Sequence, residues 1–249
     1  MNIRLLVINC MLVVSSITAM AQLEKPAPIK GETLIRHTAY TCSFNTDRLT
    51  PNYVAWCLTP DRVKGKTKRT DFFDSDPKIA AKYRVKHSDY SGSRYDRGHM
   101  CPAADNRQSL DAMTECFYMT NMCPQNHALN TGAWNDLEVQ CRSWAINYKK
   151  IYIAAGPIYG NGTPQRIGKR KNMRIAVPEK FFKVVLMMGK TPKAIGFIYD
   201  NRNVTDDIRN HAVSVDYVER LTGYDFFPQL DDATEKKVES ECKPSAWGI

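Results

Sequence analysis

The chain has little of what marks several protein classes. Among its 249 residues there are only 13 glycines and 13 prolines, and no internal repeat or low-complexity tract is present. After residue 21, no apolar run approaches the roughly 18 to 20 residues that a membrane-spanning helix needs. With 43% hydrophobic and 24% charged residues, the composition excludes a disordered, collagen-like or coiled-coil chain. It indicates a folded globular protein without a membrane span.

Cysteine follows no metal-binding spacing. No Cys-x-x-Cys pair is present, nor the histidine spacing that zinc modules use, which argues against structural zinc. If the chain enters an oxidising compartment, up to three disulfide bonds are expected among the seven cysteines beyond residue 21. We predict a bond between Cys42 and Cys57. Inert core thiols are the alternative.

The N-terminal segment has the pattern of a secretory signal peptide. One arginine precedes an apolar run over Leu5–Val14, and an Ala-Met-Ala sequence suits cleavage after Ala21. We therefore expect residues 1–21 to be a signal peptide and the mature protein to be secreted or periplasmic. Residues 22–35 contain prolines and a glycine without apolar periodicity, which predicts a flexible leader. Residues 36–249 are expected to form a single domain.

Positive charge is in excess, with 35 Lys and Arg residues against 26 Asp and Glu residues and a net charge of +9. This balance favours a polyanionic partner such as nucleic acid or an anionic membrane surface. Two basic stretches, 64–69 and 169–174, contribute to it. They either extend a track for phosphates or are ordinary solvated loop charge.

Hydrophobic periodicity predicts a mixed α and β fold. Apolar residues spaced three and four apart indicate an amphipathic helix over Ala133–Tyr148. A shorter helix is expected over Val215–Leu221, with Ser214 as its N-cap and Gly223 past its end. Alternating or apolar runs predict a sheet of several short strands, at 53–58, 150–158, 173–177, 181–188 and 194–199.

The residues that can carry chemistry lie between positions 95 and 142. In the string Asp96-Arg97-Gly98-His99, an imidazole with an ordinary pKa of about 6.5 stands beside a guanidinium that suits a phosphate. His99 can accept a proton from water at neutral pH if a neighbour fixes its tautomer. The close association of these groups favours a functional histidine over a structural one.

A carboxamide, a carboxylate and a guanidinium follow further along the chain. If one helix covers this stretch, Asn130, Trp134, Glu138 and Arg142 are successive i, i+4 neighbours on one face. An amide oxygen is a hard neutral ligand that suits Mg²⁺, and a nearby carboxylate can hold the waters of the ion. Trp134 is expected in the core. For Glu138 and Arg142, an ordinary surface ion pair is the alternative.

Several strings together have a family resemblance. They are Asp96-Arg97-Gly98-His99, Thr120-Asn121 with Pro124-Gln125, Asn130 with Gly132-Ala133-Trp134, Leu137-Glu138, and Thr222-Gly223-Tyr224-Asp225-Phe226-Phe227. In order and spacing they resemble the DNA/RNA non-specific endonuclease family of the ββα-metal (His-Me finger) superfamily, to which mitochondrial endonuclease G also belongs. The resemblance implies an α+β fold with a central antiparallel β-sheet flanked by helices. It places a metal between a β-hairpin that bears His99 and a helix that bears Asn130.

The resemblance also implies a role for each matching residue. His99 is the general base, and Asn130 is the only direct protein ligand of Mg²⁺, for which Mn²⁺ can substitute. Glu138 holds water around the ion, and Asn121 supports the site. The positions that match phosphate-binding arginines are Arg69, Arg97 and Arg142.

The expected reaction is hydrolysis of phosphodiester bonds in DNA and RNA, leaving 5′-phosphates. No residue of the motifs is assigned to a base edge, and phosphate contacts carry no sequence information, so broad cutting is expected. Two alternatives stay open. One is a secreted protein that binds nucleic acid or acts in adhesion without catalysis, and the other is an antibacterial nuclease toxin with an immunity partner.

Overall fold

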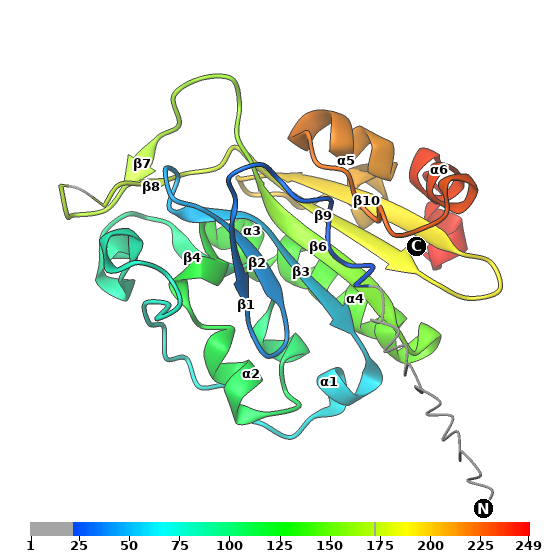
Figure 1. Ribbon diagram of the computed structural model, residues 1–249, viewed down its shortest axis with the longest axis horizontal. Helices are drawn as coiled ribbons and strands as arrows, with labels where there is room; N and C mark the ends of the chain where they lie inside the picture. Colours follow the sequence, from blue (N-terminus) through cyan, green and yellow to red (C-terminus); the bar gives the residue numbers. More distant parts are fainter. Residues whose placement is uncertain (1–21, 172) are drawn as a thin grey trace, which may run out of the picture.

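The computed structural model describes residues 22–171 and 173–249. The predicted signal peptide, residues 1–21, lies outside these described residues. Figure 1 shows a broad twisted sheet with helices packed against it. Two separate groups of buried apolar side chains form two cores, one on each face of this sheet. The fold is therefore α+β with a central antiparallel sheet, as the sequence predicts.

The central sheet has seven antiparallel strands in the order β1-β2-β3-β6-β9-β10-β11. The predicted runs at 53–58, 150–158, 181–188 and 194–199 correspond to β3, β6, β9 and β10, the four longest strands. The first two strands and the last were not predicted. The bounds are β1 Thr33–Arg36, β2 Thr41–Asn45, β3 Thr50–Leu58, β6 Ile151–Ile158, β9 Lys180–Met187, β10 Lys193–Asp200 and β11 Ala212–Val213.

Alternation along β9 shows how one strand serves both cores. Phe181 and Val185 belong to the first core, whereas Phe182 and Val184 belong to the second. Successive side chains of a strand point to opposite faces, so each core receives every second residue. Lys183 breaks the apolar pattern on the face of the first core, where it is only 1% exposed.

The two predicted helices are confirmed. α4 covers Ala133–Tyr148 and packs its apolar side into the first core. α5 covers Val215–Thr222, begins where the Ser214 side chain accepts a hydrogen bond from the amide of Tyr217, and ends at Gly223 with a φ of 72°. None of the helices in the described part of the chain has both the length and the apolar character for crossing a bilayer. The remaining α-helices outside the candidate site are α1 Pro60–Lys64, α2 Leu110–Glu115 and α6 Asp232–Ser240.

Two small hairpins stand apart from the central sheet. β4 (Asp96–His99) pairs with β5 (Met122–Gln125), and β7 (Arg166–Ile167) pairs with β8 (Ile175–Ala176). β8 is shorter than the run predicted over 173–177. The β4–β5 hairpin carries the Asp-Arg-Gly-His string, so the fold presents that string on a rigid element.

Residues 22–35, which the sequence predicts to be a flexible leader, contact the folded body instead. Leu23 and Ile29 pack against the second core, and the amide of Ala27 donates to the carbonyl of Asp225 at 2.8 Å. From Thr33 the chain is already part of β1. The isolated apolar side chains on either side of the prolines anchor this segment, although they have no periodicity to reveal it. That residues 36–249 act as a single domain stays a prediction.

The predicted disulfide bonds are wrong. All seven cysteines of the described residues are free thiols, and five of them are buried. Cys42 lies opposite Val54 in the β2–β3 register, and Cys57 is three residues further along β3. An odd separation along a strand points the Cys57 side chain to the opposite face, which prevents the bond. Burial raises the pKa of the Cys101 thiol to about 12, which agrees with the alternative of inert core thiols.

Candidate active site

Six of the seven predicted site residues line one open cavity of about 550 Å³. They come from the loop before residue 74, from β4 and from two helices. Aspartate, phenylalanine and asparagine side chains that were given no role also line it. The six predicted residues are Arg69, Arg97, His99, Asn130, Glu138 and Arg142.

The β4–β5 hairpin presents His99 at its end. His99 lies opposite Met122 in the hairpin register, and Gly98 lies opposite Cys123. A Cβ atom at Gly98 would stand 2.1 Å from the side-chain oxygen of buried Gln125. Glycine is therefore required at this position for the two strands to approach each other, and it leaves room for the histidine that follows.

The imidazole of His99 is held in an aromatic enclosure. Its ring centroid lies 5.6 Å from that of Phe73 and 5.0 Å from that of Phe117, which it meets at a right angle. The Trp134 indole donates to the His99 carbonyl at 3.3 Å. The side chain is thus fixed by packing, and the residue is 9% exposed.

The imidazole of His99 is held in its neutral form. Burial, followed by the positive charges of Arg69 and Arg97, lowers the pKa of His99 to about 3. Its Nε2 atom has no hydrogen-bond partner within the described part of the chain. A neutral imidazole that lines a polar cavity can accept a proton.

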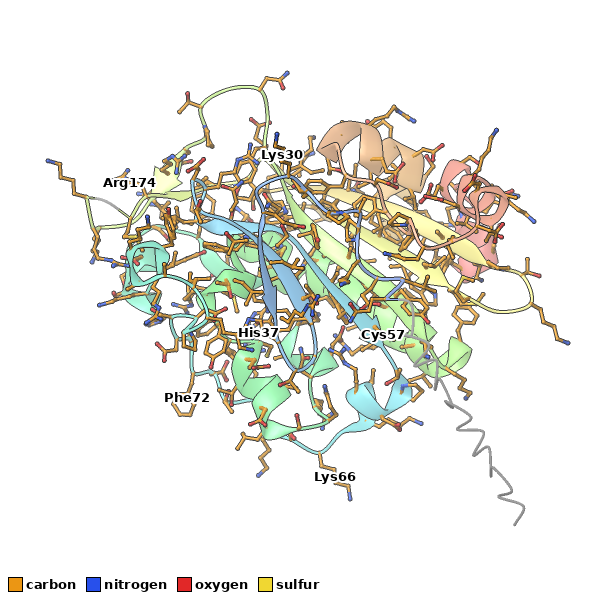
Figure 2. The ribbon with its side chains drawn as sticks, in the orientation of Figure 1. Lys30, His37, Cys57, Lys66, Phe72 and Arg174 are labelled. Carbon is orange, nitrogen blue, oxygen red and sulfur yellow. The ribbon has the colours of Figure 1, made fainter. Side chains whose placement is uncertain are left out.

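The loop that precedes the hairpin supplies an arginine and an aromatic wall. Phe73 packs against His99, and the Arg97 guanidinium lies 4.4 Å from the centre of the Phe73 ring. The neighbouring Phe72 is 76% exposed and lies at the outer edge of the molecule in Figure 2. Arg69 lies over Phe117 at 5.0 Å and donates to Asp71 at 2.6 Å. The loop and β4 therefore each place one guanidinium against a ring of the histidine enclosure, Arg69 over Phe117 and Arg97 over Phe73.

Asn130 stands on α3, which covers His127–Thr131 and follows β5 directly. Its Nδ2 atom donates to Asp96 Oδ2 at 2.8 Å, and the same oxygen contacts His127 Nδ1 at 2.9 Å. Because the amide nitrogen is used in this way, the amide oxygen is the atom left for a cation. Asp96 was part of the recognised string, but the sequence did not show that it orients Asn130.

The condition that one helix covers Asn130 to Arg142 is not met. α3 ends at Thr131 and α4 begins at Ala133, with Gly132 between them at φ −104° and ψ −113°. A Cβ atom at Gly132 would stand 2.7 Å from the carbonyl oxygen of Ala128, so the break needs glycine. Asn130 therefore reaches the cavity from a different helix than Glu138. The sequence predicted which residues meet, but not the geometry that brings them together.

α4 separates its residues between the core and the cavity. Trp134 is 1% exposed and lies in the first core, as expected, whereas Glu138 and Arg142 line the cavity. Arg142 donates to buried Asp105 at 3.2 Å rather than to Glu138. The alternative of an ordinary surface pair between Glu138 and Arg142 is therefore not observed.

Glu138 lies near charged side chains that are buried. Burial raises the pKa of Glu138 to about 7, and the positive charge of Lys183 acts in the opposite direction. The Lys183 ammonium lies 4.3 Å from the centre of the Trp134 ring. Sequence reasoning missed this lysine, although a charged residue inside the apolar run of β9 was a signal. A carboxylate in these surroundings responds strongly to a nearby cation.

Asn121 does not line the cavity. It is fully buried, its side-chain oxygen accepts from the amide of Cys101 at 2.9 Å, and its nitrogen donates to the carbonyls of Cys101 and Cys116 at 2.8 Å each. The amide of Met100 also donates to the Asn121 carbonyl at 3.0 Å. Asn121 therefore holds the segment that immediately follows His99.

A histidine on a small hairpin and an asparagine on the following helix, facing one cavity, define the ββα-metal class of nuclease fold. The family model for DNA/RNA non-specific endonucleases matches residues 19–233. The chain belongs to the DNA/RNA non-specific endonuclease family, whose members are hydrolases.

Named relatives agree with this assignment. A nuclease of a Nostoc species is 35% identical over 214 residues, which are 81% of this chain and 76% of the relative. The mitochondrial nuclease EXOG of Xenopus laevis is 32% identical over 218 residues, 82% of this chain and 61% of the relative. The crystal structure of an EndoG/EndoGI complex matches with a TM-score of 0.74 and 28% identity, covering 80% of this chain and 86% of that chain.

The relatives correct the predicted localisation. The EXOG protein of Xenopus laevis, a nuclease of Schizosaccharomyces pombe, human endonuclease G and a nuclease of Saccharomyces cerevisiae are all named as mitochondrial. The expectation of a secreted or periplasmic protein rested on residues 1–21, which lie outside the described residues. An apolar run after one arginine is therefore not sufficient to assign export.

Proposed function

We propose that this chain is a metal-dependent nuclease that hydrolyses phosphodiester bonds within both DNA and RNA and leaves 5′-phosphates. One observation carries the proposal. The imidazole of His99 and the oriented carboxamide of Asn130 line the same cavity, together with three arginines. A proton acceptor, a cation ligand and phosphate-binding groups are the parts that this hydrolysis needs.

His99 accepts the proton of the attacking water. Its lowered pKa keeps the imidazole neutral at physiological pH, so the ring can take a proton without first losing one. The aromatic enclosure of Phe73 and Phe117 prevents the ring from rotating away from the cavity. Asn121 acts indirectly, because its hydrogen bonds hold the backbone that follows the histidine.

The donor set fits Mg²⁺, with Mn²⁺ as a substitute. Asn130 offers a neutral amide oxygen, and the Glu138 carboxylate can hold the waters that such a small hard ion retains. When bound, the ion supplies Lewis-acid stabilisation of the charge on the leaving oxygen. Burial raises the pKa of Glu138 to about 7, and a nearby cation favours the ionised form that can hold these waters.

The three arginines bind and stabilise the phosphate. Arg97 lines the cavity and forms no ion pair among the described residues, so its guanidinium is free for a ligand. Arg142 is steadied by Asp105, and Arg69 by Asp71. Planar guanidinium groups pair with phosphate oxygens through charge-assisted hydrogen bonds. Such contacts ignore base identity, which supports broad cutting of DNA and RNA.

Digestion assays with a matched pair of variants test this proposal. We expect His99→Ala to lower the turnover number for plasmid DNA and for RNA by about 100- to 10,000-fold in Mg²⁺, because a general base contributes that much. Binding of nucleic acid should change little, since the arginines remain. The control is His87→Ala, which removes an exposed histidine outside the cavity. Unchanged cleavage by His99→Ala, or full cleavage by the native chain in EDTA, contradicts the proposal.

A further inference from the structure

Three carboxylates converge on the side of the sheet opposite the candidate active site. Asp216 and Glu219 stand on α5, and Glu239 stands on α6. Both helices pack against β10, and their buried residues Val218 and Val238 belong to the second core. The α4 helix of the candidate active site packs into the first core instead. The cluster is therefore separate from the site of the proposed hydrolysis.

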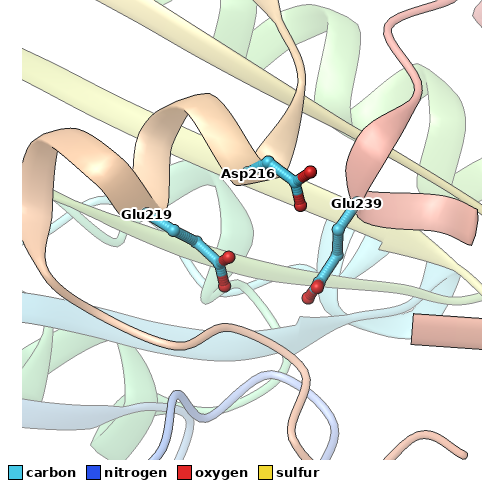
Figure 3. A group of neighbouring side chains, drawn as sticks. All are labelled: Asp216, Glu219 and Glu239. Atoms are coloured by element: carbon cyan, nitrogen blue, oxygen red, sulfur yellow. The ribbon is translucent and has the colours of Figure 1, made fainter. Parts of the chain in front are cut away.

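The three side chains have the geometry of a ligand set. One carboxylate oxygen from each of Asp216, Glu219 and Glu239 lies within 4.8 Å of the others. Figure 3 shows the carboxyl groups turned toward one another from two different helices. Asp216 and Glu219 are three residues apart in α5, so they share one face of it. Negative groups that repel each other are thus held together by the fold.

The surroundings of Glu239 are a second, independent observation that points to a ligand. It is only 6% exposed, and its Oε1 atom has no hydrogen-bond partner within the described residues. Burying a carboxylate without a partner is unfavourable, so proteins normally pair it or bind a metal to it. The nearest charged groups do not meet this need, because Asp225 and Glu235 add further negative charge.

The carboxylate of Glu219 is held in place by the backbone. Its Oε1 atom accepts a hydrogen bond from the amide of Phe226 at 2.7 Å. No lysine, arginine or histidine of the described residues forms an ion pair with any of the three carboxylates. A backbone hydrogen bond therefore fixes Glu219, and burial fixes Glu239. No positive side chain in the described part of the chain compensates the negative charge of the cluster.

We propose that Asp216, Glu219 and Glu239 bind one Ca²⁺ ion that ties α5 to α6. Ca²⁺ takes six to eight oxygen ligands in flexible geometry and accepts several carboxylates, whereas Mg²⁺ keeps most of its waters and uses one or two. Three carboxylates from two helices, with water completing the shell, match the larger ion. The ion is structural, because the cluster lies away from the cavity that holds His99 and Asn130.

Thermal unfolding with CaCl₂ as the probe tests the site. The experiment uses the full-length Asn130→Ala protein, so that an ion in the candidate active site does not contribute. After EDTA treatment, saturating CaCl₂ should raise Tm by about 5 to 10 °C, the shift for a ligand at about 100 times its Kd in a protein of this size. Calorimetric titration should show one Ca²⁺ per chain, and MgCl₂ should produce a smaller shift.

Two charge-removing variants make the result specific. Glu239→Gln and Asp216→Asn, each added to Asn130→Ala, should lose the CaCl₂ shift and the calorimetric signal. Each variant in the otherwise native chain should keep the Mg²⁺-dependent cleavage of the native protein, because neither residue touches the active-site cavity. The same Tm shift in both variants, or no saturable Ca²⁺ binding by the Asn130→Ala protein, overturns the inference. If Glu239→Gln does not fold, Asp216→Asn alone decides between these outcomes.

Discussion

Asp96 shows at the scale of one residue how the candidate metal ligand is positioned. Its Oδ2 atom accepts a hydrogen bond from the Asn130 amide and contacts the His127 ring nitrogen, and it thereby links β4 to α3. The sequence predicted that Asn130 and His99 belong to one site. It could not predict this hydrogen bond, because the contact depends on how the hairpin and the short helix pack.

Removing Asp96 should weaken metal dependence more than maximal rate. In Asp96→Ala, the Asn130 carboxamide is free to rotate, and loss of such a supporting contact typically costs 10- to 100-fold in metal affinity. We expect the Mg²⁺ concentration for half-maximal cleavage to rise by about that factor. Asp136→Ala is the control, because it removes an exposed carboxylate from α4 outside the cavity. An unaltered Mg²⁺ titration in Asp96→Ala contradicts the positioning role.

At the scale of elements, the sequence predicted what local signals encode. The bounds of α4 and both caps of α5 follow from periodicity, a serine N-cap and a terminal glycine. β1 and β2 were missed because short strands near a sheet edge are stabilised by their neighbours rather than by their own pattern. The break at Gly132 was missed for a related reason, since only the approach of the Ala128 carbonyl makes glycine necessary there.

The β4–β5 hairpin depends on a glycine for its close approach. Gly98→Ala places a methyl group against the buried Gln125 side chain, and overpacking of this kind costs about 1 to 3 kcal/mol. We expect the free energy of unfolding, measured in urea, to fall by that amount, and cleavage to fall because His99 is displaced. Gly162→Ala is the matched control, since its Cβ atom meets nothing within 4 Å. Equal stability of the two variants would show that the hairpin can open without cost.

At the scale of the whole molecule, the positive charge is not all available to a nucleic acid. Arg170, in the second basic stretch, forms an ion pair with buried Asp89 and donates to the carbonyl of Arg84 at 3.0 Å. Arg174 donates to the carbonyl of Arg166 at 3.1 Å. This stretch therefore holds loops together. A net charge of +9 indicated the class of partner, but the sequence could not separate structural arginines from those that face the cavity.

The free energy of unfolding should depend on pH because His99 is buried in the folded chain. Its pKa is about 3 in the folded chain against an ordinary value of 6.5, so between these values the unfolded chain binds more protons. The free energy of unfolding therefore falls as pH decreases through this window, by up to about 1.4 kcal/mol per pH unit from this one group. Asp76, whose lowered pKa reflects hydrogen bonds from His37 and Thr120 that outweigh its burial, acts in the same direction only in stronger acid.

Comparison of two variants isolates the contribution of His99 to this slope. Urea unfolding is measured from pH 4 to pH 6.5 in EDTA, so that no ion competes for the cavity. His99→Asn should flatten the dependence on pH relative to the native chain, whatever its absolute stability, because the group that gains a proton on unfolding is gone. Asn135→Ala should keep the native slope, because it removes a side chain from the same cavity that does not titrate. Parallel slopes for the native chain and His99→Asn would mean that the imidazole has the same pKa in the folded and the unfolded chain, which contradicts the lowering of its pKa by burial.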